Sequence, residues 1–117
     1  AAGAAARGEG ELRRCAALGL ANLTCEDGVQ EIVGGVPDLL AALVEVVAVE
    51  CDPETCCCAV GALANLSFRS PDNARRICEV PAAVSSLLLC LGPTRPPETR
   101  RHAARALASL AYSAAAA

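Results

Sequence analysis

The chain has 117 residues, of which 54% are apolar and 20% are charged, and its formal net charge is −3. It is too apolar and too weakly charged to be disordered, and an acidic chain whose ten basic residues are all Arg is a poor binder of nucleic acid or anionic membranes. Trp and Met are absent, and Tyr and Phe occur once each. Small and branched aliphatic side chains must therefore fill the core, which suits closely packed helices.

The first predicted element is a helix over residues 10–24. Its apolar residues recur at steps of three and four and form one stripe of an amphipathic helix: Leu12, Ala16, Leu20 and Leu23. A short helix over about 28–33 follows and is ended by the Gly-Gly pair at 34–35. Pro37 opens a further helix that runs to about Val49, and Pro37, Asp38 and Glu45 interrupt its apolar run, so no membrane span is expected.

A second long helix is predicted over residues 53–67, where Asp52 can cap, Pro53 suits the first helical position and Glu54 suits the positive end of the helix dipole. Three more helices are predicted over 71–79, 81–91 and 97–111, and each opens at a proline. No segment shows the period-2 alternation of a strand, so the fold class is all-α.

An internal repeat organises these elements. The segments 10–24, 53–67 and 97–111 align without gaps, at offsets of 43 and 44 residues. The stretches between them, 28–47 and 73–91, also match, the second being one residue shorter around its Val-Pro. Each repeat is therefore predicted to contain three helices, of which the third is the long one.

A three-helix unit of this length resembles the armadillo repeat. The resemblance rests on "ALGLANLT" and "AVGALANLS" in the long helices and on "IVGGVPDLLAAL" between the two preceding ones, and it covers roughly residues 10–112. It implies a right-handed superhelix of about two and a third repeats. The two-helix HEAT repeat is the competing family, and the Gly-Gly-Val-Pro junction and the Asn-Leu-Ser/Thr ending favour armadillo.

The predicted divisions follow from this alignment. Residues 9–24 are the third helix of a partial repeat, and residues 25–67 and 68–113 are two repeats. The Ala-rich ends, 1–8 and 114–117, are either genuine low-complexity sequence or positions without an assigned side chain. Since one unit cannot bury its apolar faces alone, we expect the chain to belong to a longer solenoid or a multi-subunit complex.

Residues four apart on the long helices share a face and form three rows, which we call the ladder residues: Arg14, Leu18 and Asn22; then Gly61 and Asn65, with Cys57; then Arg101, Arg105 and Ser109. In armadillo proteins the third helices line the concave groove, and an Asn at the position of Asn22 and Asn65 clamps the backbone of an extended peptide. Ser109 departs from that pattern, and Leu18, Gly61 and Arg105 stand where an aromatic residue is usual. The Arg residues would favour an acidic or phosphorylated segment. The alternative is that Asn22 and Asn65 only cap or bridge neighbouring backbone.

The eight cysteines are interpreted as reduced, small, buried apolar residues, since most fall within helical patterns and three are consecutive. Cys15, Cys58 and His102 occupy equivalent places in successive long helices, but stacked helices lie roughly 10 Å apart, too far for one zinc ion to span comfortably. We therefore expect no metal and no cofactor.

Catalytic signatures are also missing from the sequence. The acidic residues near the first helix junction, such as Glu26 and Glu31, fall near helix starts, where they stabilise the dipole. The P-loop, GxGxxG, GxSxG and HExxH motifs do not occur.

The sequence thus predicts a non-enzymatic protein–protein interaction module, a scaffold or adaptor that holds a partner segment on its third-helix surface. Two alternatives stay open: a structural subunit of a large stable assembly, and a regulatory arm of an enzyme whose catalytic domain lies elsewhere. The resemblance implies a eukaryotic intracellular protein, cytoplasmic, nuclear or cytoskeletal.

Overall fold

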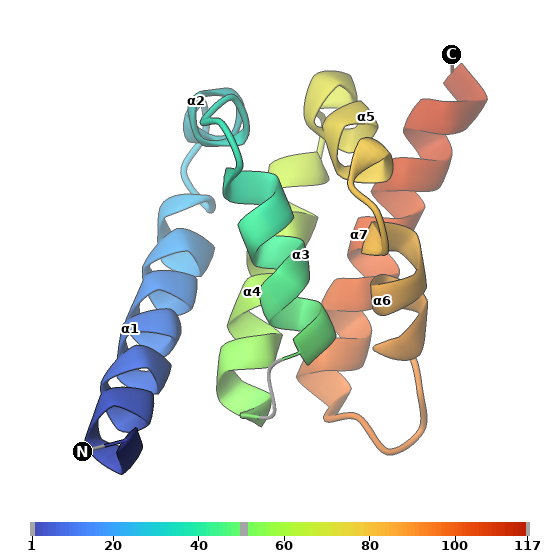
Figure 1. The fold of residues 1–117 in the computed structure, drawn as a ribbon. Helices are drawn as coiled ribbons and strands as arrows, with labels where there is room; N and C mark the ends of the chain where they lie inside the picture. The colour runs from blue at the N-terminus through green and yellow to red at the C-terminus, as the bar shows by residue number, and fades with distance from the viewer. Residues whose placement is uncertain (1, 50–51, 117) are drawn as a thin grey trace.

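The computed structural model describes the backbone of residues 2–49 and 52–116, and side chains from 8 to 49 and from 52 to 114. Within these residues the fold is all-α, as predicted (Figure 1). The helices are α1 (Ala2–Leu23), α2 (Val29–Gly34), α3 (Leu39–Val49), α4 (Pro53–Ser67), α5 (Pro71–Glu79), α6 (Ala83–Leu89) and α7 (Pro97–Ala116). The two interpretations of the Ala-rich ends, genuine low-complexity sequence or positions without an assigned side chain, concern residues that lie mostly outside the described side chains. No helix in the described part is long and apolar enough to cross a bilayer.

The helix boundaries largely follow the local signals in the sequence. The predicted limits of α4 and α5 are confirmed. Helix α1 begins earlier than predicted and α7 ends later, because Ala, the strongest helix former, continues α1 at its N-terminal end and α7 at its C-terminal end. By contrast, α3 and α6 start two residues after the prolines that were predicted to open them, Pro37 and Pro81. The residue before each helix, Asp38 or Ala82, has a left-handed backbone conformation, with φ of 66° and 69° respectively, so the helix begins only after it.

Side-chain caps fix the starts of α4 and α5. The Oδ2 atom of Asp52 accepts hydrogen bonds from the Thr55 backbone N at 3.1 Å and from the Thr55 hydroxyl at 2.6 Å. These bonds hold the pKa of the Asp52 carboxyl below its usual value. At α5 the hydroxyl of Ser70 accepts from the backbone N of Asn73 at 3.3 Å, a cap that the sequence analysis did not single out.

The longer helices of the described part of the chain form two layers, and two short helices lie at one end. Figure 1 shows α1, α4 and α7 side by side and running in the same direction, with α4 in the middle and in contact with both neighbours. The second layer consists of α3, which packs on α4, and α6, which packs on α7 and α3. The short helices α2 and α5 lie across the same end of the molecule, at the top of the view.

The core lies around α4. Ala59, Val60, Ala62, Leu63 and Leu66 are all completely or almost completely buried, because α4 is covered by helices on several sides. We expected small residues at the equivalent positions 19, 62 and 106 to let helices approach closely. Positions 62 and 106 are buried Ala residues. The prediction is wrong for Gly19, which is exposed, since a Cβ there would meet nothing within 4 Å.

Asn73 at the start of α5 joins this helix to α2 and α4 by hydrogen bonds. Its fully buried amide nitrogen donates to the backbone oxygen of Gln30 on α2 at 2.8 Å and to that of Leu66 on α4 at 2.9 Å. Its oxygen accepts from Arg76 at 3.0 Å. The amide lies against Gly34, where it occupies the space that any side chain would need. The Gly-Gly junction therefore serves tertiary packing as well as ending α2.

Candidate interaction surface on the long helices

The ladder residues fall on the three parallel helices, as predicted, but they differ in exposure. Five are exposed: Arg14, Leu18 and Asn22 on α1, and Arg101 and Arg105 on α7. Asn65 and Ser109 are half-buried, and Gly61 is buried. Two of the exposed guanidinium groups pair within their own helices, Arg14 with Glu11 at 2.5 Å and Arg101 with Glu98. Such exposed pairs contribute little to stability, and they leave the guanidinium groups accessible.

Gly61 is covered by a side chain from the next long helix. A Cβ at Gly61 would lie 3.4 Å from both Cδ2 and Nε2 of His102, so the imidazole ring rests on the glycine. Gly61 therefore offers no surface of its own to a partner, and His102 takes its place on this face. His102 aligns with Cys58 and Gly61 aligns with Arg105, so the repeat alignment gives no signal for this contact.

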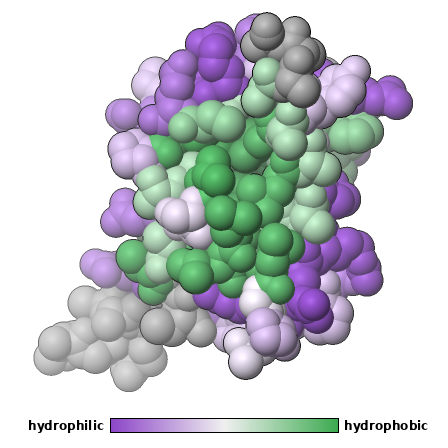
Figure 2. Space-filling view, turned by 90° about the vertical axis from the view of Figure 1, so that its right-hand side faces the viewer, coloured by the Kyte–Doolittle hydropathy of each residue, from purple (hydrophilic) through white to green (hydrophobic). Residues whose placement is uncertain are grey.

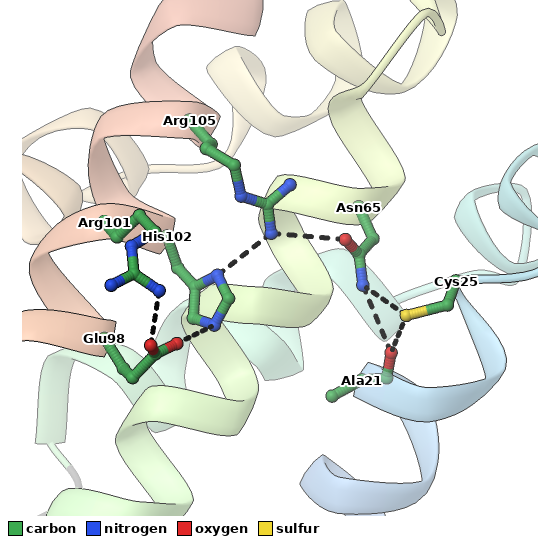
Figure 3. Close-up of polar contacts among 7 residues, drawn as sticks. All are labelled: Ala21, Cys25, Asn65, Glu98, Arg101, His102 and Arg105. Atoms are coloured by element: carbon green, nitrogen blue, oxygen red, sulfur yellow. Dashed lines mark hydrogen bonds and ion pairs between the residues drawn. The ribbon is translucent and has the colours of Figure 1, made fainter.

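A chain of polar contacts crosses all three long helices (Figure 3). On α7, Glu98 lies 3.7 Å from Nε2 of His102, and Nδ1 of His102 lies 2.9 Å from Nη2 of Arg105. The same Nη2 donates to Oδ1 of Asn65 on α4 at 3.3 Å, and Nδ2 of Asn65 donates to the backbone oxygen of Ala21 on α1 at 3.1 Å. We call these five residues the polar chain.

The protonation state of His102 follows from its partners. A guanidinium can only donate, so Nδ1 of His102 must accept from Arg105, and the imidazole is neutral with its proton on Nε2, towards Glu98. Burial, and then the positive charge of Arg105, lower the pKa of His102 below its usual 6.5, and the carboxylate of Glu98 opposes this shift. The neutral ring is therefore the form present at pH 7.

Asn65 is already engaged within the molecule. Besides Ala21, its Nδ2 lies 3.2 Å from the hydroxyl of the buried Thr24 and 3.6 Å from the sulfur of Cys25. The last carbonyls of a helix have no partner within the helix, and Asn65 supplies a donor to this end of α1. The geometry thus matches the alternative in which Asn65 bridges neighbouring backbone. Asn22, one repeat earlier, is exposed.

The described cysteines fall into three groups, of which Cys57 and Cys58 form the half-buried one. Cys56 and Cys90 are buried as expected; they share a hydrogen bond that raises the pKa of Cys56, and Arg95 donates to the Cys56 sulfur at 3.7 Å. The expectation of burial is wrong for three others, since Cys15, Cys25 and Cys78 are exposed. Cys51 lies outside the described residues. All the described cysteines are free thiols, and nowhere among the described residues do three His, Cys, Asp or Glu side chains gather as a metal site would require.

The acidic residues near the first junction, among them Glu26, Asp27 and Glu31, are exposed to solvent.

No family model, curated protein or solved structure matches this chain.

Proposed function

We propose that the chain is a section of an armadillo-type superhelix and that it acts as a non-catalytic protein–protein interaction module. Two units of short, medium and long helix, α2–α4 and α5–α7, follow one long helix, α1 (Figure 1). This order and the parallel long helices support about two and a third repeats. The partner would lie across α1, α4 and α7.

The observation that carries the proposal is the position of Arg105. Its guanidinium is exposed, yet it is held from two sides by His102 on its own helix and by Asn65 on the neighbouring helix. These contacts use the Nη2 group, and a guanidinium has further N–H donors in a fixed plane. A guanidinium held in place loses less conformational entropy when it binds a carboxylate or phosphate. Arg101, one turn earlier, adds a second positive charge to the same face.

The partner that fits is an extended acidic or phosphorylated protein segment. Arg14, which is paired with Glu11, lies at the other edge of the face on α1, so a segment lying across the three helices would meet an Arg on the first and two on the last. Asn22 offers the backbone of such a segment an exposed amide, which donates and accepts at once. Asn65 contributes indirectly, by holding Arg105.

Fluorescence anisotropy with a labelled, phosphoserine-containing acidic peptide tests this proposal, with the same peptide carrying Gln and Ser as the uncharged probe. We expect the acidic peptide to bind and Arg105→Glu to weaken it about tenfold or more, since charge-assisted hydrogen bonds are lost and repulsion is added. Arg100→Glu is the matched control, because it makes the same charge change at a neighbouring exposed position of α7. Equal weakening by both variants would show that the face responds to net charge without a site, and equal binding of both peptides would show that charge plays no part in the binding.

A second function, structural subunit of a stable assembly, is favoured by a different observation. Figure 2 shows a broad apolar surface on the side of the molecule where α6 and α7 lie in Figure 1. Apolar patches of this kind mark surfaces that other protein covers.

A further inference from the structure

Two buried cysteines from different sequence repeats meet in the interior of the molecule. Cys56 lies in the first turn of α4, and Cys90 follows directly after α6. They are only 3% and 0% exposed. Their side chains share a hydrogen bond, although the two residues are 34 positions apart in the chain. This contact joins the long helix of the first repeat to the end of the medium helix of the second, and it involves neither terminal helix.

The neighbouring cysteines on α4 are placed differently. Cys57 and Cys58 are half-buried, and successive residues of an α-helix project about 100° apart around its axis. Because the side chain of Cys56 points at Cys90, the other two are directed elsewhere. The cysteines of α1, of the turn after it and of α5 are exposed: Cys15, Cys25 and Cys78. Cys56 and Cys90 are thus a specific pair among the described cysteines.

The surroundings of the pair favour a thiolate on Cys90. The hydrogen bond from Cys56 lowers the pKa of Cys90; burial opposes this shift, and the positive charge of Arg95 supports it. The same hydrogen bond, and then burial, raise the pKa of Cys56. The Arg95 guanidinium lies against the pair, where it donates to the Cys56 sulfur at 3.7 Å. Cys90 is therefore the nucleophilic sulfur of the two, and Cys56 keeps its proton.

We propose that Cys56 and Cys90 are a redox-active dithiol that hydrogen peroxide converts reversibly into a disulfide, which ties the start of α4 to the end of α6. A cysteine whose thiolate is stabilised reacts with peroxides, and a second thiol beside it resolves the product before further oxidation. Burial of both sulfurs restricts the reaction to a small oxidant. This inference goes beyond the proposed function, because it uses the interior between the repeats and none of the ladder residues.

The oxidation proceeds in two steps and uses one peroxide molecule. In the first, the Cys90 thiolate attacks one peroxide oxygen, the O–O bond breaks, and the leaving hydroxide takes up the proton that Cys90 had lost and becomes water. Cys90 is then a sulfenic acid. In the second, the Cys56 sulfur attacks the sulfur of Cys90, the S–O bond breaks, and the departing hydroxide leaves with the Cys56 proton as a second water. The two sulfurs have lost two electrons, and the two peroxide oxygens have gained them.

The positions of the two residues suit such a bond. A disulfide S–S bond is about 2.05 Å long, so the hydrogen-bonded sulfurs need to approach by only about 2 Å. Cys56 stands at the start of one helix and Cys90 just beyond the end of another, where fewer backbone hydrogen bonds resist a shift than in the middle of a helix. The bond would close a loop that contains all of α5 and α6, and a cross-link of this kind stabilises a protein by restricting its unfolded chain.

Peptide mapping of the full chain by mass spectrometry tests the inference. The purified protein is treated with hydrogen peroxide, its remaining thiols are blocked with a maleimide, and its peptides are released without reduction. We expect one disulfide, between Cys56 and Cys90. The oxidised protein should melt roughly 10 °C above the reduced one, since the bond closes a loop of about 35 residues, and dithiothreitol should reverse the shift.

Three single substitutions assign the roles of the sulfurs. Cys90→Ser should form no disulfide, because it removes the nucleophile. Cys56→Ser should also form none, but its Cys90 should stay as a sulfenic acid that dimedone captures. Cys57→Ser is the matched control: it removes a half-buried thiol from the neighbouring position of α4 and should oxidise as the wild type does. If a substitution at either buried position prevents folding, the disulfide map of the wild type decides by itself.

Three results would overturn the inference. A wild type in which peroxide produces no bond between Cys56 and Cys90 would show that the pair only packs the core. A disulfide that forms equally fast in Cys90→Ser would show that other cysteines react. Loss of the bond in Cys57→Ser to the same extent as in Cys90→Ser would show that the reaction is not specific to the buried pair.

Discussion

Replacing Gly34 by Ala should destabilise the protein, although Ala is the better helix former. A Cβ at Gly34 would overlap the amide group of Asn73, whose Nδ2 would lie 2.6 Å away. Asn73 is completely buried and has no room to move without breaking its two hydrogen bonds to Gln30 and Leu66. The added methyl group must therefore displace a side chain that joins the two repeats.

The expected magnitude follows from these contacts. Losing two hydrogen bonds to buried carbonyls costs about 1–2 kcal/mol each, and the higher helix propensity of Ala returns up to about 1 kcal/mol. The free energy of unfolding should fall by about 2–3 kcal/mol, which corresponds to a drop in Tm of roughly 10 °C for a domain of this size. Gly19→Ala is the matched control, because a Cβ at Gly19 meets nothing within 4 Å, and it should leave the stability unchanged or raise it.

A double-mutant cycle followed by urea unfolding separates the clash from other effects. Asn73→Ala removes the amide, so Gly34→Ala should cost little or nothing in that background, and the two changes should couple by about 2 kcal/mol. If Gly34→Ala lowers stability equally with and without Asn73, the overlap with the amide is not the cause. If Gly34→Ala melts like the wild type, the packing of α5 on α2 described above is wrong.

Three further predictions concern the polar chain and a helix cap. Asn65→Ala should lower the free energy of unfolding by about 1–2 kcal/mol because it removes the hydrogen bonds that join α4 to Ala21 of α1 and to Arg105 of α7. The exposed Asn22→Ala should change it by less than about 0.5 kcal/mol, and equal values in urea titrations would contradict the bridging role. The pKa of His102 is lowered in the folded state, so its contribution to stability is complete above pH 6.5 and is lost as the pH falls through the lower folded value. Thermal melts of the wild type should therefore lose more stability on acidification than those of His102→Gln, and parallel losses would refute this. Ser70→Ala should cost about 1 kcal/mol by removing the cap of α5, measured by thermal unfolding, and an unchanged Tm would show that the cap is not needed.

The helices were predictable because their signals are local. A proline, a capping side chain and a stripe of apolar residues act within one or two turns of chain, and they predicted α4 and α5 to the residue. The internal offset of 43 and 44 residues also placed the ladder residues of α1, α4 and α7 on equivalent positions of long helices. The order of helices and their shared faces could thus be derived from the sequence by itself.

Contacts between residues far apart in the chain could not be derived in this way. Asn65 matched a peptide-clamping position, but it holds Ala21 and Arg105, which lie about forty residues away in each direction. Equivalent apolar stripes are buried in α4 and exposed in α1, although their sequence patterns are alike. Periodicity shows which residues share a face of a helix, whereas burial and hydrogen bonding depend on whether another helix lies against that face. Only the tertiary structure decided which amides and apolar stripes are already occupied and which are free for a partner.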